Sequence, residues 1–327
     1  MKIAIDVMGG DYAPEEIIKG VLMAAQTSPD VHLILVGQKE RMLPFLAGTS
    51  PENISLVEAA EVIGMDEHPA QAVRKKKDAS IVVATHLVKL GGADAVVSAG
   101  STGAQMAAAL LGLGRIKGIE RPAIATVLPT IEGGKLILDV GANPDATPGQ
   151  LCQYALMGSI YAEKILRIPN PRVGLLNVGS EEGKGNELTQ KAYPLLRDAP
   201  INFMGNIEGR DVPYGRADVV VCEGFVGNIL LKMAEGLAGV FVQVIKEKIT
   251  SNMIRKLGAL AVKPGLKEFA QMMDYAEYGG APLLGVNGIS IICHGSSKMK
   301  AIFNAIRVAQ ECVQTQFIEQ IREELPK

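Results

Sequence analysis

The sequence predicts an α/β fold in which a mainly parallel β-sheet lies between two layers of helices. Short apolar runs, typical of strands buried on both faces, alternate with longer segments of helical period along the 327 residues. The 36 glycines favour many tight strand-to-helix turns. Apolar residues make up 48% of the chain and charged residues 21%, so a sizeable core can form and extensive disorder is not expected.

The expected elements alternate regularly along the chain. Strands are expected where apolar runs end at a glycine or a turn, at 2–7, 31–37, 53–58, 94–100, 123–129, 135–141, 172–179, 217–224 and 289–295. Helices are expected between them, at 14–27, 69–90, 102–114, 148–167, 185–197, 225–250 and 296–324. Pro14 stands at the start of the first helix, where its fixed φ is tolerated. Because no linker is visible, residues 1–327 are expected to form a single intertwined catalytic unit.

The composition argues against several classes of protein. The net charge of -2 argues against nucleic-acid binding by bulk charge. The four cysteines form no C-x-x-C pair and no zinc spacing, so a reducing cytoplasm is expected. The N-terminus enters a strand-like run at once, which argues against a signal peptide. The sequence shows no run near the ~20 apolar residues of a membrane span.

Nearly every expected strand ends in a glycine and a small polar group. In open α/β sheets, ligands bind in the crevice beyond the carboxyl ends of the strands. We therefore expect six loops to converge on one cleft that binds a polar ligand, and their chemistry favours an anion. The loops are DVMGGD (6–11), SAGSTGA (98–104), DVGANPDATP (139–148), NVGSEEGKGN (177–186), CEGFVGN (222–228) and CHGSSK (293–298).

The loop SAGSTGAQ, residues 98–105, follows a strand and opens a helix. Gly100 and Gly103 let backbone N–H groups approach a ligand, and Ser101 and Thr102 supply hydroxyls at the positive end of the helix. These residues predict a phosphate site. The alternative is that Ser101 or Thr102 only caps the helix.

The loop LNVGSEEGKGNE, residues 176–187, resembles a P-loop but lacks its spacing and its Ser or Thr after the lysine. It still places Lys184 as a mobile cation between glycines, with Asn177, Ser180 and Gly183 nearby. We expect Lys184 to be catalytic and the others to bind substrate. The alternative is a solvated lysine on a flexible turn.

Two further loops carry polar groups at strand ends. Asp139 and Asn143 are expected to position a substrate group, although Asp139 could instead bond only the loop amides. Glu223 and Phe225 are expected to contact substrate at a helix entrance. Asn228, in the same segment, is expected to be catalytic.

The loop CHGSSK supplies His294, for which we predict a catalytic role, and Ser296, which we expect to bind substrate. The alternative for a lone histidine is a structural role. No nucleophile elbow and no Cys–His signature appears in the sequence, so direct transfer between two bound substrates is favoured over a covalent enzyme intermediate. No cofactor and no metal are expected.

Six segments occur in a characteristic order over essentially the whole chain, and they are MKIAIDVMGGDYAP, SAGSTGA, LDVGAN, NVGSEEGKGN, EGFVGN and GVNGISIICHGSS. Together they resemble the bacterial acyl-(acyl carrier protein):phosphate acyltransferases of phospholipid synthesis. The resemblance implies a three-layer fold like phosphate acetyltransferases and isopropylmalate dehydrogenases, and a homodimer. It implies transfer of a fatty acyl group from acyl-carrier protein to inorganic phosphate. The acyl phosphate would feed a membrane glycerol-3-phosphate acyltransferase. The alternatives are a decarboxylating dehydrogenase of the same fold and a non-catalytic phosphometabolite-binding protein.

Two surfaces are expected to serve the partners that the resemblance implies. The basic runs Arg74–Lys77 and Lys246, Lys248, Arg255 and Lys256 are the candidate docks for the acidic carrier protein, and a solvated helix face is the alternative for the first run. Residues 225–274 are expected to project as a helical hairpin for dimerisation. Its tip, within 251–267, would place Leu257, Leu260 and Val262 in an anionic membrane surface, so a peripheral location on the inner face of the cell membrane is expected. The alternative places this tip in the dimer interface.

Overall fold

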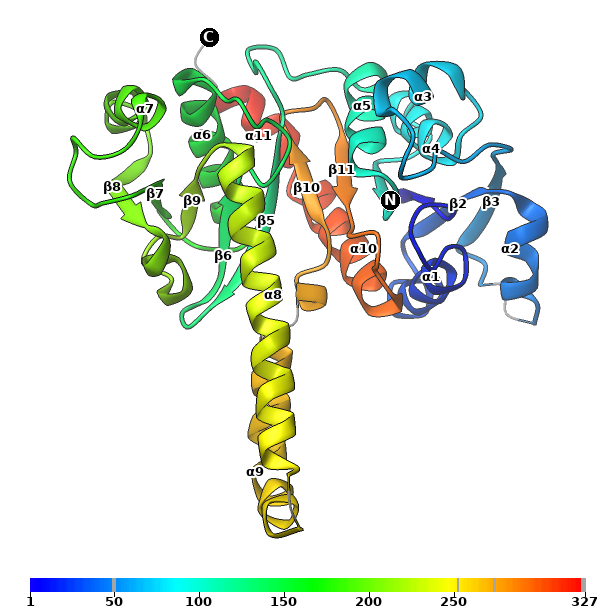
Figure 1. The fold of residues 1–327 in the computed structure, drawn as a ribbon. Helices are drawn as coiled ribbons and strands as arrows, with labels where there is room; N and C mark the ends of the chain where they lie inside the picture. The colour runs from blue at the N-terminus through cyan, green and yellow to red at the C-terminus, as the bar shows by residue number, and fades with distance from the viewer. Residues whose placement is uncertain (49–50, 252, 273–274, 325–327) are drawn as a thin grey trace.

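The computed structural model describes residues 1–48, 51–251, 253–272 and 275–324. Its described strands form one eleven-stranded sheet in the order β3-β2-β1-β4-β11-β10-β5-β6-β9-β7-β8 (Figure 1). The strands are β1 Lys2–Asp6, β2 His32–Gly37, β3 Ile54–Glu58, β4 Ala95–Ser98, β5 Ala123–Thr130, β6 Gly133–Leu138, β7 Arg172–Asn177, β8 Asn202–Glu208, β9 Val219–Val221, β10 Ala281–Leu284 and β11 Ile289–Ile292.

The sheet consists of two parallel halves that are joined through antiparallel strands at its centre. β3, β2, β1, β4 and β11 pair in parallel, and so do β6, β9, β7 and β8. Between the halves, β11, β10, β5 and β6 each pair antiparallel to the next. These three reversals turn the carboxyl ends of the two halves to opposite edges. The six loops therefore leave the sheet at two edges, although loops from both halves line one cavity that is described below. Mainly parallel pairing is confirmed.

Helices cover both faces of the sheet, which confirms the three-layer α/β/α fold. They are α1 Glu15–Thr27, α2 Lys39–Leu46, α3 Pro69–Lys75, α4 Ser80–Lys89, α5 Thr102–Gly112, α6 Pro148–Lys164, α7 Glu187–Arg197, α8 Gly224–Ile249, α9 Met253–Met272, α10 Met299–Gln314 and α11 Phe317–Glu324. One core joins α1, α6, α10 and α11 to one face of the sheet. Two smaller cores join α3, α4 and α5, and the first turns of α8, to the other face.

The sequence pattern missed three elements and merged two pairs of helices. The edge strand β8 contains Gly205 at φ 97°, β10 is four residues long, and α2 contains Pro44, so none shows a clear apolar period. The expected helix 69–90 is divided into α3 and α4. The expected helix 296–324 ends at Gln314, because Gln316 adopts a φ of 50°, and α11 continues beyond it.

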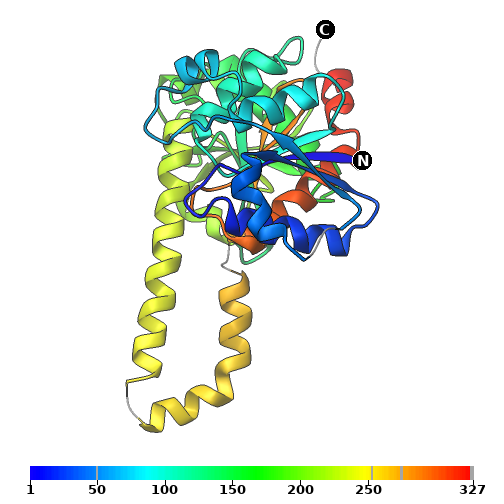
Figure 2. The ribbon, with the colours of Figure 1, turned by 90° about the vertical axis from the view of Figure 1, so that its right-hand side faces the viewer.

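The helices α8 and α9 leave the body as a long hairpin (Figures 1 and 2). α9 begins at Met253, so the segment expected as a tip is itself helical. α9 bends partway along its length in Figure 2, as expected from the helix-breaking Pro264 inside it. By length and composition α8 is also apolar enough to cross a membrane, so the expectation that no segment meets that criterion is wrong.

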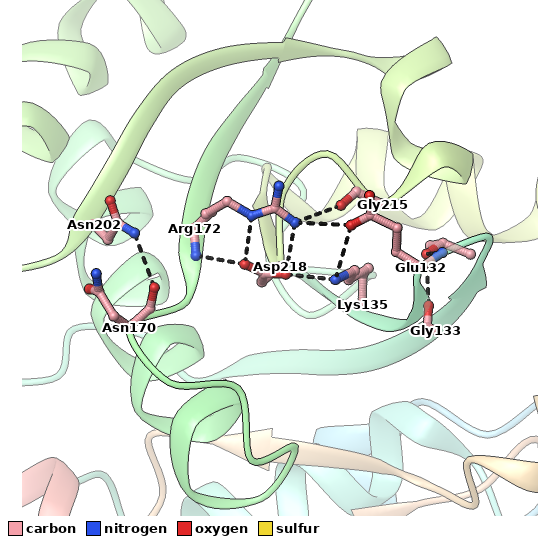
Figure 3. Close-up of polar contacts among 9 residues, drawn as sticks. Glu132, Gly133, Lys135, Asn170, Arg172, Asn202, Gly215 and Asp218 are labelled. Carbon is pink, nitrogen blue, oxygen red and sulfur yellow. Dashed lines mark hydrogen bonds and ion pairs between the residues drawn. The ribbon is translucent and has the colours of Figure 1, made fainter.

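A buried polar network fixes β6, β7 and β9 together (Figure 3). Asp218 Oδ1 accepts from Lys135 Nζ over 2.6 Å, and Oδ2 accepts from the side-chain Nε and the backbone N–H of Arg172, each over 2.9 Å. Arg172 also donates to the carbonyl oxygen of Gly215 over 3.0 Å. Burial alone raises the pKa of Asp218, but the hydrogen bonds from Arg172 and Lys135 outweigh it and hold the pKa at about 2.

Candidate active site

Three loops of the N-terminal half of the sheet pack against one another. The backbone N–H of Asp11 donates to the carbonyl oxygen of Gly295 over 2.8 Å. A Cβ on Gly9 would lie 2.6 Å from the Gly100 nitrogen, so only glycine allows this approach. The structure therefore brings together the loops that follow β1, β4 and β11.

A small hollow lies between these loops beside the buried carboxyl group of Asp6. Its volume of about 10 Å³ is room for one water molecule, and Ser98, Gly100 and Ser101 line it. Asp6 Oδ2 accepts a hydrogen bond from Ser98 Oγ over 2.7 Å, and Ser98 Oγ accepts one from the Gly100 N–H over 3.1 Å. Burial raises the pKa of Asp6. Gly100 and Ser101 thus face a polar hollow.

The N-terminus of α5 divides the predicted residues into two roles. Ser101 Oγ accepts the N–H of Ala104 over 3.4 Å, which is the capping role given as its alternative. Thr102 instead lines a large cavity described below. Gly103 packs against Pro69, at the start of α3, and a Cβ there would lie 2.6 Å from the Pro69 Cγ.

Asp139 fixes the loop that follows β6. Its side chain is fully buried, and Oδ1 accepts from the backbone N–H groups of Ile124, Gly141 and Ala142 over 2.9–3.2 Å. Oδ2 accepts from the backbone N–H of Asn143 over 2.7 Å and from its amide over 3.1 Å. This is the alternative given for Asp139, in which the carboxylate bonds the loop amides. Burial raises the pKa of Asp139, and these bonds oppose the rise.

The first turn of α8 is anchored on this loop. Glu223 caps α8 by accepting the N–H groups of Phe225 over 2.5 Å and Val226 over 3.1 Å. The Asp139 carbonyl oxygen occupies the space that a Cβ on Gly227 would need. Phe225 is left 61% exposed, outside the residues that line the cavity. The anchored turn places Asn228 at the cavity.

A cavity of about 970 Å³ lies between α8 and the centre of the sheet. Strand β5 contributes Ile124 and Thr126 to Pro129 to its floor, and residues around β10 and β11 complete it. Polar side chains from five segments reach it, and they are Thr102, Thr126, Asn228, Lys232, Glu235, Tyr278 and His294. The rest of the wall is mostly apolar, and on α8 it is formed by Leu230, Leu231, Met233, Ala234, Leu237, Ala238, Phe241 and Val242. Three predicted residues, Thr102, Asn228 and His294, are thus brought to one cavity.

Lys232 contacts the His294 ring in this cavity. Its Nζ lies 3.2 Å from His294 Nε2 and 2.8 Å from Glu235 Oε2. Because a lysine ammonium can only donate, Nε2 is the acceptor and Nδ1 donates to Ser296 Oγ over 2.7 Å. The Ser296 backbone nitrogen also lies 3.2 Å from Nδ1, but donation there would leave Nε2 and Nζ as two facing donors. The His294 ring thus lies between Lys232, at Nε2, and Ser296, at Nδ1.

The sequence pattern missed Lys232, although a signal for it was present. Asn228 and Lys232 are four residues apart on one helix, so their side chains share a face. Cys293 also lines the cavity, and burial raises the pKa of its thiol to about 12, which disfavours the nucleophilic thiolate. Within the described residues, no three His, Cys, Asp or Glu side chains gather in a way that could hold a metal ion.

The loop that follows β7 has a fixed shape but stands apart from the cavity. Asn177 Nδ2 donates to the Lys184 carbonyl oxygen over 3.1 Å, so that amide holds the loop. Gly185 adopts a φ of 100°, which favours glycine. Ser180, Gly183 and Lys184 are exposed, and the described lining of the cavity includes none of them. Their substrate roles remain predictions.

Comparisons with known proteins find relatives that match nearly the whole chain. The profile of the family described as "Fatty acid synthesis protein" matches residues 1–320. A phosphate acyltransferase from Desulfitobacterium hafniense (strain DSM 10664 / DCB-2) is 71% identical over 329 residues, covering 100% of this chain and 98% of that protein. Another, from Heliobacterium modesticaldum (strain ATCC 51547 / Ice1), is 60% identical over 331 residues with the same coverage.

A solved structure confirms the fold. The phosphotransacetylase from Streptococcus pyogenes superposes with a TM-score of 0.65 at 19% identity, covering 98% of this chain and 94% of that one. From the family profile and the full-length relatives, the chain belongs to the phosphate acyltransferase family, enzymes that transfer an acyl group to phosphate.

Proposed function

We propose that this phosphate acyltransferase takes a fatty acyl group from an acyl-carrier-protein thioester and gives acyl phosphate for phospholipid synthesis. The observation that carries the proposal is the cavity of about 970 Å³, which joins a polar region at Lys232 and His294 to a long apolar wall. Ligand pockets span about 300–1,000 Å³, so this one has room for a long hydrocarbon chain. The polar groups at one part of it suit the thioester and the phosphate.

The transfer proceeds by direct attack. An oxygen of hydrogen phosphate bonds to the thioester carbon, and the carbonyl becomes an oxyanion. The C–S bond then breaks, and the thiolate leaves. His294 Nε2 accepts the phosphate proton and returns it to the sulfur, so acyl phosphate and a free thiol result. The Lys232 ammonium and the Asn228 amide stabilise the oxyanion, because both reach the same cavity.

The loop that carries Lys184 supplies a second cation. It follows β7, beside β9, whose own carboxyl end leads into α8. Parallel neighbours end at the same edge of a sheet, so this loop and the anchored first turn of α8 lie at one edge. In this proposal, Lys184, with Ser180 and Gly183, holds the incoming phosphate.

The decisive experiment measures free carrier protein that is released from acyl-carrier protein by the purified enzyme. We expect release that requires phosphate, is indifferent to NAD and yields acyl phosphate. Release without phosphate, or no release at all, contradicts the proposal. Membership of the acyltransferase family already argues against the dehydrogenase and the non-catalytic binding protein.

The second proposed feature is a homodimer through α8. Apolar residues follow one face of this helix at spacings of three or four, the seam pattern of paired helices. They are Val226, Ile229, Met233, Leu237, Val240 and Val244, all exposed. Met233 and Leu237 also line the cavity. A second copy of the chain has the same seam, so the two seams can pack against each other about a two-fold axis. Ile229→Glu plus Val240→Glu should sediment as a monomer, whereas an unchanged dimer excludes this seam.

The third proposed feature is membrane contact at the hairpin tip. Val262 is 53% exposed on α9, and the side chains of Leu257 and Leu260 lie outside the described residues. Exposed Arg255 and Lys263 give the same segment positive charge, which suits an anionic bilayer. Leu257→Glu plus Leu260→Glu should abolish flotation with anionic vesicles and retain turnover. A double variant that still floats excludes the tip as the anchor. Delivery to a membrane glycerol-3-phosphate acyltransferase follows from such contact.

The fourth proposed feature is a carrier-protein dock on α3. This helix begins at Pro69, against Gly103 at the α5 terminus that carries Thr102 into the cavity. Arg74, Lys75 and Lys77 are exposed, whereas Lys76 pairs with Glu67 over 2.7 Å. Arg74→Glu plus Lys75→Glu should raise the KM for acyl-carrier protein. Lys246→Glu plus Lys248→Glu, far along α8, is the control. If this variant raises the KM for acyl-carrier protein instead, the carrier protein docks at the second basic run and not on α3.

A further inference from the structure

The helix α8 presents one face to the cavity, and the residues of that face change character along its length. We define this cavity face by Leu230, Leu231, Ala234, Ala238, Phe241 and Val242. Two alanines, one helical turn apart, thus stand between pairs of larger side chains. Both alanines are half-buried. The smallest side chains of the face are thus Ala234 and Ala238, next to Met233 and Leu237, which also line the cavity.

The polar side chains that border this face lie only in its first part. Asn228, Lys232 and Glu235 reach the cavity from α8, and beyond Glu235 the α8 residues that line it are apolar or glycine. From Lys232 to Val242 the helix rises about 15 Å, at about 1.5 Å per residue. Strand β5 runs beneath with Ile124 to Pro129, a length of about 16 Å. Two independent elements thus give the apolar stretch the same length.

That length matches a fatty acyl chain. An extended hydrocarbon advances about 1.25 Å per methylene, given C–C bonds of about 1.5 Å. The stretch from Lys232 to Val242 therefore accommodates about 12 methylenes in one line. Acyl transfer to phosphate is the activity of the family, so a hydrocarbon tail needs an apolar site beside the reacting thioester.

We propose that α8 measures the acyl chain, with the thioester at Lys232 and His294 and the methyl end beside Phe241 and Val242. Ala234 and Ala238 are then the residues that set the accepted chain length. The inference rests on the proposed function, and it adds a direction of the chain and two specificity-determining positions. Ala234 lies one turn, about 6 Å, nearer to the polar region than Ala238, which corresponds to about five methylenes.

The two positions predict a graded effect of added bulk. Ala238 lies about 9 Å, or about seven methylenes, beyond Lys232. Ala238→Leu should therefore lower kcat/KM for thioesters of C12 and longer by about tenfold to a hundredfold and retain C8, since extra methylenes in a packed space cost this much. Ala234→Leu should extend the loss to chains about five carbons shorter, C8 included. The measurement is kcat/KM for C8, C10, C12, C14 and C16 thioesters with phosphate. Calorimetric binding of the matching fatty acids gives a second readout that needs no turnover.

The matched control is Gly236→Leu on the same helix. A Cβ at Gly236 meets nothing within 4 Å, and Gly236 is outside the described cavity lining. This variant should keep the wild-type order of chain lengths. The inference is overturned if both alanine variants lower kcat/KM equally for all chain lengths, or if Ala238→Leu excludes shorter chains than Ala234→Leu does. It is also overturned if the two variants change only the oligomeric state in sedimentation, as expected for a cavity that a second copy of the chain fills. If fatty acids bind in the graded order but no thioester reacts with phosphate, the proposed function is wrong, but Ala234 and Ala238 still set the accepted chain length.

Discussion

Two clusters in this molecule each pair a lysine with a carboxylate, but one cluster is buried and the other lies at the wall of a cavity. In the network at Asp218, Lys135 lies 2.6 Å from a carboxylate that three further donors from Arg172 complete, and the Asp218 side chain is 7% exposed. In the cluster at His294, Lys232 lies 2.8 Å from Glu235 and 3.2 Å from the imidazole, and its side chain is 50% exposed at the cavity. The first cluster is closed by protein groups, whereas the second opens to a space that a ligand can enter.

The difference separates a structural use of charge from a chemical one. A buried carboxylate whose oxygens all accept hydrogen bonds from the protein cannot bind a substrate as well. Loss of one partner leaves the remaining buried groups unpaired. A cation at the wall of a cavity can turn to a new partner as charge develops there. Changes at Asp218 should therefore alter stability, and changes at Lys232 or Lys184 should alter turnover.

The largest effect is expected at Asp218. Asp218→Asn leaves the buried Lys135 with only the more distant carboxylate of Glu132, 3.9 Å away, as a counter-charge, so the free energy of unfolding should fall by about 3–5 kcal/mol. Urea denaturation measures this loss, and kcat of the folded fraction should remain unchanged. Glu187→Gln is the control, because its pair with Lys191 is exposed on both sides and its loss should change the free energy of unfolding far less. Equal losses in both variants would show that Asp218 does not hold the strands.

The next effect is expected at Lys184. Lys184→Ala removes the proposed phosphate cation, which should raise the barrier by about 3–4 kcal/mol and lower kcat about a hundredfold to a thousandfold. Unfolding by urea should match wild type, since the Lys184 side chain is exposed. Lys191→Ala, on the following helix, is the control. A folded Lys184→Ala protein with turnover near wild type removes Lys184 from the catalytic residues.

A similar but smaller loss of turnover is expected at Lys232. Lys232→Met keeps the length of the side chain and removes its charge, so kcat should fall by up to about a hundredfold through weaker oxyanion stabilisation. Lys246→Met, further along α8, controls for loss of a helix charge. If Lys232→Met changes only the free energy of unfolding, the cluster at His294 is structural like the one at Asp218.

The sequence predicted the layers of the fold better than it predicted the site. Buried strands such as β1 and β2 can be recognised from their own apolar residues, whereas β8 and β10 are strands mainly because they pair with neighbouring strands of the sheet. Asn228 and His294 were predicted from their loops, and the structure brings both to the cavity. Lys232 was missed because its role depends on His294, which is 62 residues away and meets it only through the fold.

The smallest effect is the acid sensitivity of the closed cluster. The pKa of Asp218 is held at about 2, below its usual 3.8, so its ionised form stabilises the folded protein. This stability is fully present above pH 3.8 and is lost as the pH falls through about 2. The shift corresponds to about 2 kcal/mol, at about 1.4 kcal/mol per unit. Urea denaturation of wild type and Asp218→Asn at pH 6 and at pH 2.5 should show the difference between them narrowing in acid. A difference that stays constant between these pH values would show that the carboxylate does not titrate with folding.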